Sequence, residues 1–176
     1  DTEAEKFAGL KFKVKDAGGD ATPTRIDGIE VSIGGTGLNP ATDIAWAELH
    51  NGTISVATAT GANITNSKII FGVASNSDNA AALDAVPDNT SKEYTLNIYM
   101  KPSKLDAIEG QAYTFDVDES RVFVDSGYSS QMVGDTAKID LVTGAISIDV
   151  SKFEILTETN LDMLTVDSGV GANIKV

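Results

Sequence analysis

The chain has 176 residues, 41% of them hydrophobic, which is enough apolar material for the core of one β-sandwich. Its formal net charge of −13 disfavours nucleic acid and anionic membranes as partners, because those surfaces are also negative. Cysteine is absent and His50 is the sole histidine, which excludes thiolate chemistry and multi-histidine metal sites. No apolar run approaches the length of a transmembrane helix, so membrane insertion is not expected.

Alternating apolar and polar residues dominate the first half of the chain. Residues 10–15 alternate apolar and basic side chains strictly, which predicts a half-buried strand. The pattern returns at residues 26–33, where Asp27 and Gly28 interrupt it and predict a turn or bulge. Residues 53–60 and 68–73 predict two more strands.

A polar connection follows at residues 75–88, and its alanine-rich centre at residues 80–83 favours one or two helical turns. Residues 93–101 then form the clearest strand pattern in the chain. The apolar face of this strand is predicted to carry Tyr94, Leu96, Ile98 and Met100. The opposite face is predicted to carry Thr95, Asn97 and Tyr99.

Further alternating sets occur at residues 113–117, 122–124, 139–150 and 153–156. About ten short strands separated by Gly, Asn and Asp turns predict an all-β fold, a β-sandwich of immunoglobulin-like or jelly-roll type. We expect Trp46 to be the largest core residue. The other large side chains expected in the core are Phe71, Tyr94, Phe115 and Phe153.

The sequence predicts three segments: an N-terminal extension (1–8), the sandwich (9–157) and a β-prone C-terminal tail (158–176). The chain starts at Asp1 without a methionine, and we expect an exported protein whose leader has been removed.

Residues 12–26 read FKVKDAGGDATPTRI. This run resembles the opening of the β-sandwich repeats of large exported, adhesin-type bacterial surface proteins. Further matches follow in order at residues 46–53, 69–71, 88–96 and 145–157. The resemblance implies an extracellular, immunoglobulin-like domain at the cell surface, without catalysis and without a universal ligand.

Such repeats usually stand in tandem, whereas this chain holds one unit with extra material at each end. That difference favours a structural subunit that polymerises with copies of itself, because a terminal strand can pair with an open sheet edge of a neighbour. A head-to-tail contact of this kind builds a filament. The same strands could instead pair within their own sandwich, or the tail could be a linker. The candidate donor residues are Leu161, Met163, Leu164, Val166, Ile174 and Val176 at the C-terminus, and Phe7, Leu10 and Phe12 at the N-terminus.

Two acidic groups are candidate calcium ligands. Asp16 and Asp20 flank a Gly-Gly turn, and Asp116, Asp118 and Glu119 cluster at a strand end. Calcium prefers several carboxylate and carbonyl oxygens at a turn. Asp and Gly also favour turns without any metal, so turn formation is the alternative for the first group.

No catalytic machinery is recognisable, because a Gly-x-Ser-x-Gly elbow is absent and aromatic residues make up only 6% of the chain. We therefore expect a non-enzymatic protein with no cofactor other than calcium. The alternative function is a carbohydrate-binding module of an exported protein. Its candidate aromatic residues are Tyr99, Tyr113 and Tyr128, of which Tyr99 is expected to be exposed.

Overall fold

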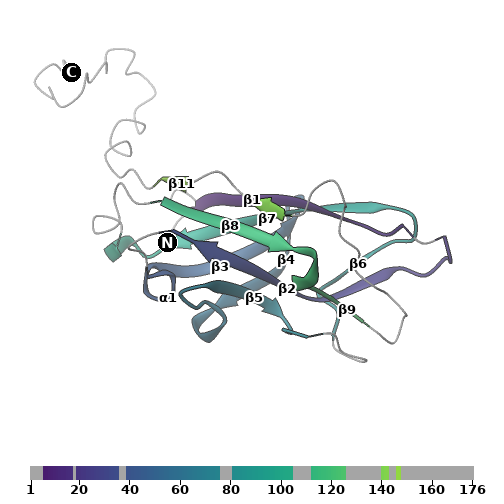
Figure 1. Cartoon of the computed structure of the whole chain (residues 1–176), viewed down its shortest axis with the longest axis horizontal. Coiled ribbons are helices and arrows are strands. Elements are labelled where there is room, and N and C mark those ends of the chain that lie inside the picture. Colours follow the sequence, from purple (N-terminus) through teal and green to yellow (C-terminus); the bar gives the residue numbers. More distant parts are fainter. Residues whose placement is uncertain are drawn as a thin grey trace, which may run out of the picture.

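The computed structural model describes residues 6–17, 19–35, 39–75, 81–104, 112–125, 140–142 and 146–147. Strands dominate these residues and form two antiparallel sheets that pack face to face (Figure 1). The predicted all-β sandwich is therefore confirmed. The predictions for Phe153, Tyr128 and the C-terminal donor residues concern positions outside these ranges.

The first sheet, called sheet A, has four strands in the order β1-β7-β3-β4. Their bounds are β1 Lys6–Lys15, β7 Ser91–Met100, β3 Ile44–Asn51 and β4 Ile54–Thr60. β1 thus begins before residue 9 and is paired along its length with β7.

The second sheet, called sheet B, follows the order β10-β8-β2-β5, with β6 and β9 also paired to β2, and β11 paired to β8. Its strands are β10 Asp140–Val142, β8 Ala112–Asp118, β2 Thr24–Gly34, β5 Lys68–Gly72, β6 Asp84–Val86, β9 Val122–Val124 and β11 Ile146–Ser147.

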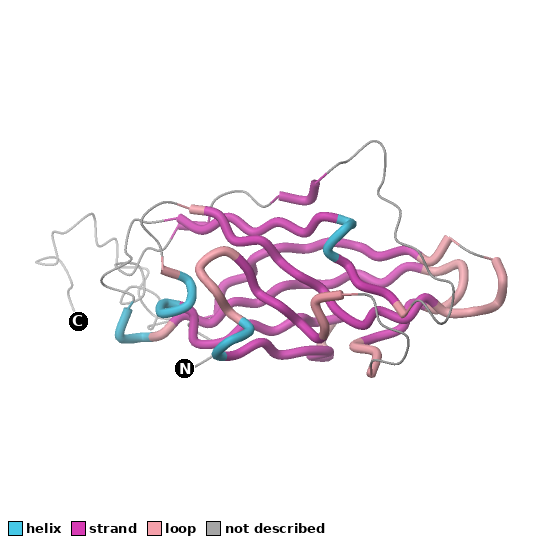
Figure 2. The backbone as a smooth tube through the Cα atoms, turned by 60° about the horizontal axis from the view of Figure 1, so that its bottom comes forward, coloured by secondary structure: helices cyan, strands magenta, loops and turns pink. Residues whose placement is uncertain are grey.

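The helices of the described residues are single turns between strands (Figure 2). They are α1 Pro40–Asp43, η2 Gly61–Asn63, η3 Pro102–Lys104 and η4 Glu119–Arg121. No helix in this part of the chain has the length and hydrophobicity needed to cross a membrane. The helical turn expected around residues 80–83 is not seen at residues 81–83, and β6 follows directly because it finds a pairing partner in β2.

β2 is the central strand of sheet B, and the strands on both of its sides are interrupted at the level of Asp27 and Gly28. On one side, β5 pairs with β2 from Gly28 onward, and β6 pairs with it up to Ile26. On the other side, the register of β9 shifts between Ile26 and Gly28, which confirms the predicted bulge. The chain leaves β5 through Gly72, whose φ of 71° favours glycine.

The core lies between the sheets and is filled by alternate residues of each strand. The predicted inward face of β7 is confirmed, because Tyr94, Leu96, Ile98 and Met100 are all buried. Phe71 and Phe115 are also in the core, as expected. Trp46 is not: buried Ala47 and Leu49 alternate with it along β3, so it lies on the outer face of sheet A and is only partly buried.

Two buried tyrosine hydroxyls connect the sheets at opposite ends of the sandwich. The Tyr94 hydroxyl of sheet A donates to Asp84 Oδ2 of β6 at 2.9 Å. The Tyr113 hydroxyl of sheet B donates to Asp43 Oδ2 of α1, which leads into β3, at 3.1 Å. Figure 1 shows β6 and α1 at the two ends. The carboxylate that accepts is buried in the case of Asp43 and partly buried in the case of Asp84.

Candidate functional site

The two edges of sheet A differ in chemistry. β1 forms one edge and carries Lys6, Lys11, Lys13 and Lys15. Its register with β7 also shifts between Ala8 and Leu10, and Lys13 Nζ lies 3.8 Å from Glu93 Oε2. Lysines and bulges on an edge strand are devices that oppose pairing with another chain. The β1 edge is therefore protected.

β4, with the sequence ISVATAT, forms the other edge and carries no lysine, although its register with β3 also shifts, between Leu49 and His50. The strand contains no charge and no proline, and four of its seven residues are β-branched. Within the described residues β4 pairs with β3 alone. Ile54 begins the strand and is 67% exposed. No other large hydrophobic side chain among the described residues is classed as exposed. This edge can accept a further strand.

The N-terminal donor candidates are placed in their own sheet. Phe7, Leu10 and Phe12 all belong to β1, which pairs with β7 of the same chain. Leu10 and Phe12 are buried in the core, and Phe7 packs against it. The C-terminal candidates, Leu161, Met163, Leu164, Val166, Ile174 and Val176, lie outside the described residues.

The first calcium candidates take part in turn hydrogen bonds. Asp16 Oδ2 accepts from the backbone N–H and the hydroxyl of Thr24, both at 2.8 Å. Asp20 Oδ1 accepts from the Thr22 N–H at 2.8 Å. These contacts match the alternative in which Asp and Gly shape the turn.

The second calcium candidates follow one another along β8 and η4. Asp118 Oδ1 caps η4 by accepting from the Ser120 N–H at 2.7 Å. Asp116 pairs with Ser32 of β2, and Glu119 starts η4. Among the residues that the structure describes, no group of three or more His, Asp or Glu side chains is arranged to hold a metal ion.

A polar and aromatic cluster covers part of the outer face of sheet A. Trp46 stacks on Tyr99 of the neighbouring strand, with ring centroids 4.4 Å apart and planes at 16°. Glu48 Oε2 accepts from the Tyr99 hydroxyl at 3.0 Å and lies 2.9 Å from His50 Nε2. Trp46, Glu48 and His50 share this face because they alternate along β3.

The prediction that Tyr99 is exposed is wrong, since the side chain is only 5% exposed. Its strand pattern placed it correctly on the outer face, but the stacked indole of Trp46 covers it. Tyr113 is buried in the core. The described tyrosines therefore do not form an exposed row.

Comparisons with protein-family models, with curated proteins and with solved structures gave no match for this chain.

Proposed function

We propose that this chain is a structural subunit of an extracellular filament or cell-surface adhesin, related to the immunoglobulin-like repeats of exported bacterial proteins, and that it assembles head-to-tail by strand donation. The observation that carries the proposal is the difference between the two edges of sheet A. β1 is rich in lysine, whereas β4 is uncharged and pairs with β3 alone in the described chain.

An extended segment added to β4 gains hydrogen bonds along the backbone and apolar contacts at its start. Ile54 offers exposed apolar surface, whose burial contributes about 25 cal/mol per Å². Thr58 and Thr60 are exposed and uncharged, so no buried charge results from pairing at this edge.

The donor is the C-terminal segment 161–166 of the next copy. β1 is a costly donor, because its withdrawal would expose Leu10, Phe12 and Val14, and each such side chain contributes roughly 1.5–3 kcal/mol when buried. Segment 161–166 reads LDMLTV, which is apolar and β-prone. The acceptor and the donor are different surfaces, so the contact does not close on itself and repeats as a fibre.

The test compares polymerisation of the full chain with two kinds of variant, by light scattering and negative-stain electron microscopy. One variant ends at residue 157. The other carries Thr58→Lys and Thr60→Lys, which give β4 the charges that protect β1. Ser103→Lys, which adds a single positive charge at an exposed residue of η3, is the control for added charge away from β4.

The full chain and the Ser103→Lys control are expected to form fibres, and both other variants are expected to stay monomeric. A peptide spanning residues 158–170 should bind the truncated chain but not its β4-lysine form. Fibres from the truncated chain would overturn C-terminal donation, and fibres from the β4-lysine variant would overturn the choice of acceptor edge.

Glycan binding at the outer face of sheet A is the second candidate function. Its supporting observation is the row Trp46, Glu48 and His50, which combines a partly exposed aromatic ring with hydrogen-bonding groups. A glycan array of the monomeric chain should then show hits that Trp46→Ala removes and Tyr128→Ala leaves unchanged. An array without hits would dismiss this function.

A further inference from the structure

Asp27 occupies the interruption in sheet B where the neighbours of β2 change. Its backbone carbonyl accepts from the Val73 N–H at 3.2 Å, and the preceding Ile26 carbonyl accepts from the Leu83 N–H at 2.7 Å. The chain between β5 and β6 therefore begins and ends against this point of β2. The backbone of Val73 lies so close to Gly28 that a Cβ there would collide with the Val73 carbonyl oxygen.

The Asp27 side chain is fully buried, at 0% exposure, and neither of its carboxylate oxygens has a hydrogen-bond partner. The other buried acids of this sheet contrast with it. Glu30, for example, binds Lys68 at 2.9 Å and Arg121 at 3.1 Å. Burying a carboxylate without a partner is costly, so this group calls for a compensating charge.

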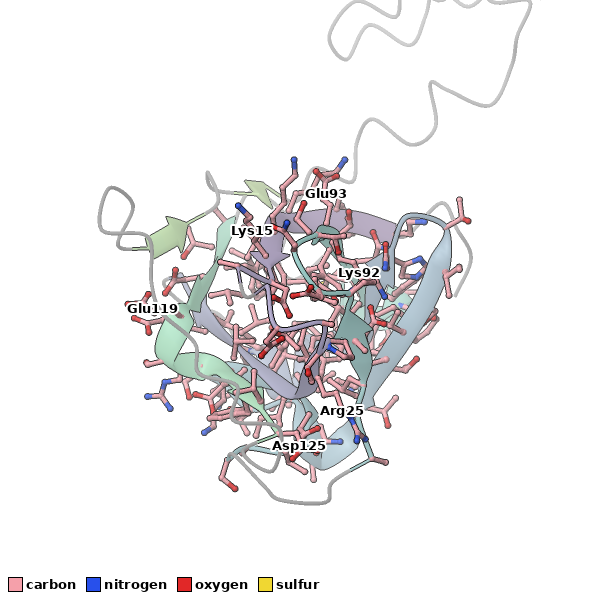
Figure 3. All side chains as sticks on the ribbon, turned by 90° about the vertical axis from the view of Figure 1, so that its right-hand side faces the viewer. Lys15, Arg25, Lys92, Glu93, Glu119 and Asp125 are labelled. Carbon is pink, nitrogen blue, oxygen red and sulfur yellow. The ribbon has the colours of Figure 1, made fainter. Side chains whose placement is uncertain are left out.

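A second buried carboxylate, Asp125, stands next to this position. Its N–H donates to the Arg25 carbonyl at 3.1 Å, which fixes it beside the segment that leads to Asp27, and its side chain is 4% exposed. Arg25 Nη1 lies 3.6 Å from Asp125 Oδ2, and Figure 3 shows these two side chains together at this end of the molecule. The guanidinium of Arg25 thus contacts Asp125, while the carboxylate oxygens of Asp27 are without a hydrogen-bond partner.

Burial, and then the negative charge of Asp125, raise the pKa of Asp27, while Arg25 acts in the opposite direction. This repulsion agrees with the geometry, since Val124 pairs with Ile26 and the Asp125 N–H bonds to the Arg25 carbonyl, both next to Asp27 in the sheet. A cation between them would relieve both the repulsion and the missing partners of Asp27.

We infer that Asp27 and Asp125 bind a divalent cation, calcium by the chemistry of the site. Carboxylate oxygens, with backbone carbonyls and water completing the shell, are the ligands that calcium prefers. The Val73 carbonyl, which packs against Gly28 next to Asp27 in the chain, is one backbone candidate. With only two carboxylates, the site belongs to the weak class typical of extracellular modules, with a dissociation constant of about 0.1–1 mM. None of the five acidic residues singled out from the sequence takes part.

The experiment measures calcium binding to the full chain by isothermal titration, and the melting temperature with EDTA or with calcium. Its variants are Asp27→Asn and Asp125→Asn. Asp20→Asn, which changes an exposed turn carboxylate, is the control. Magnesium replaces calcium in a parallel series, because its smaller, stricter shell suits this site less.

Calcium should raise the melting temperature of the parent and of the Asp20→Asn control, and each of the other variants should bind it at least about tenfold more weakly. In EDTA the melting temperature of Asp27→Asn should equal or exceed that of the parent. The reason is that burying a neutral amide costs less free energy than burying a carboxylate without a partner. If Asp27→Asn does not fold, Asp125→Asn decides the affinity comparison.

Equal calcium affinity in the parent and in Asp27→Asn would overturn the site. So would a parent chain that calcium does not stabilise but that mild acid does, since a proton on Asp27 would then be the compensating charge. Neither result touches the β4 edge, so this site and the assembly mechanism stand or fall separately.

Discussion

The Tyr94 hydroxyl reaches out of the core of the sandwich to donate to Asp84 Oδ2 at 2.9 Å, and so joins a strand of sheet A to a strand of sheet B. Asp84 also binds Lys92 Nζ at 2.6 Å and the Ala85 N–H at 2.8 Å. Burial and the neighbouring Asp84 carboxylate both raise the pKa of Tyr94, so its hydroxyl remains a donor at any physiological pH.

Replacing Tyr94 with Phe should destabilise the fold by about 1.5–3 kcal/mol, because it removes a hydrogen bond to a charged acceptor between the sheets. Urea unfolding followed by fluorescence measures this loss. Tyr99→Phe is the matched control, since its hydroxyl also donates to a carboxylate, Glu48, but on the outer face of a single sheet. A loss for Tyr94→Phe no larger than for Tyr99→Phe would show that the connection between sheets adds no stability.

Asp84 should make the fold sensitive to acid. Burial alone raises its pKa, but hydrogen bonds from Lys92, the Ala85 N–H and Tyr94 outweigh burial, and the net result is a pKa below the ordinary 3.8. A carboxyl group with a lowered folded pKa stabilises the fold above its unfolded pKa, and this contribution is lost as the pH falls through the folded value.

The stability advantage of the parent chain over Asp84→Asn should therefore be constant from about pH 5 to pH 8 and shrink below about pH 4. Chemical unfolding of both proteins across this range provides the measurement. An advantage that persists unchanged down to pH 2 would contradict the assignment.

The ion pairs around Glu30 should respond asymmetrically to substitution. The Glu30 side chain is 6% exposed, whereas Lys68 is 36% and Arg121 is 50% exposed. Removing both cations leaves a buried carboxylate uncompensated, but removing Glu30 leaves two cations that water can solvate. We expect Lys68→Met with Arg121→Met to cost about 2–4 kcal/mol and Glu30→Met clearly less, as measured by urea unfolding. Equal costs would mean that Glu30 is solvated in solution.

Gly28→Ala should destabilise the sandwich by about 2–3 kcal/mol, because the new methyl group meets the Val73 carbonyl and the backbone must move. Gly52→Ala is the comparison. Gly52 has a φ of 61° but open space around its Cβ position, so alanine there costs only the conformational strain of about 1–2 kcal/mol. Thermal melts of the two variants distinguish a steric clash from strain, and a milder effect at Gly28 would contradict the close approach.

Strand alternation predicted most of the fold, because one buried face imposes a period of two on each strand. The inward face of β7 follows from its sequence, and the interruption at Asp27 and Gly28 was visible in the pattern of β2. The start of α1 had a weaker signal, Pro40 at a first helical position, and was not predicted.

The alternation within one strand does not predict which side chains of neighbouring strands contact each other. Trp46 was expected in the core on account of its size, although buried Ala47 and Leu49 beside it carried the signal for an outward position. The burial of Tyr99 depends on that indole, which comes from another strand. The partnerless carboxylate of Asp27 depends on how β5, β6 and β9 end against β2, which is a property of the assembled sheet.

Tyr94 and Tyr113 connect the two sheets through hydrogen bonds to carboxylates. In many exported domains disulfides provide such connections, but this chain contains no cysteine. A reductant cannot cleave these hydrogen bonds, and no oxidant is needed to form them. Reducing conditions should therefore leave the stability of the sandwich unchanged, whereas strong acid, which protonates the accepting carboxylates, should lower it.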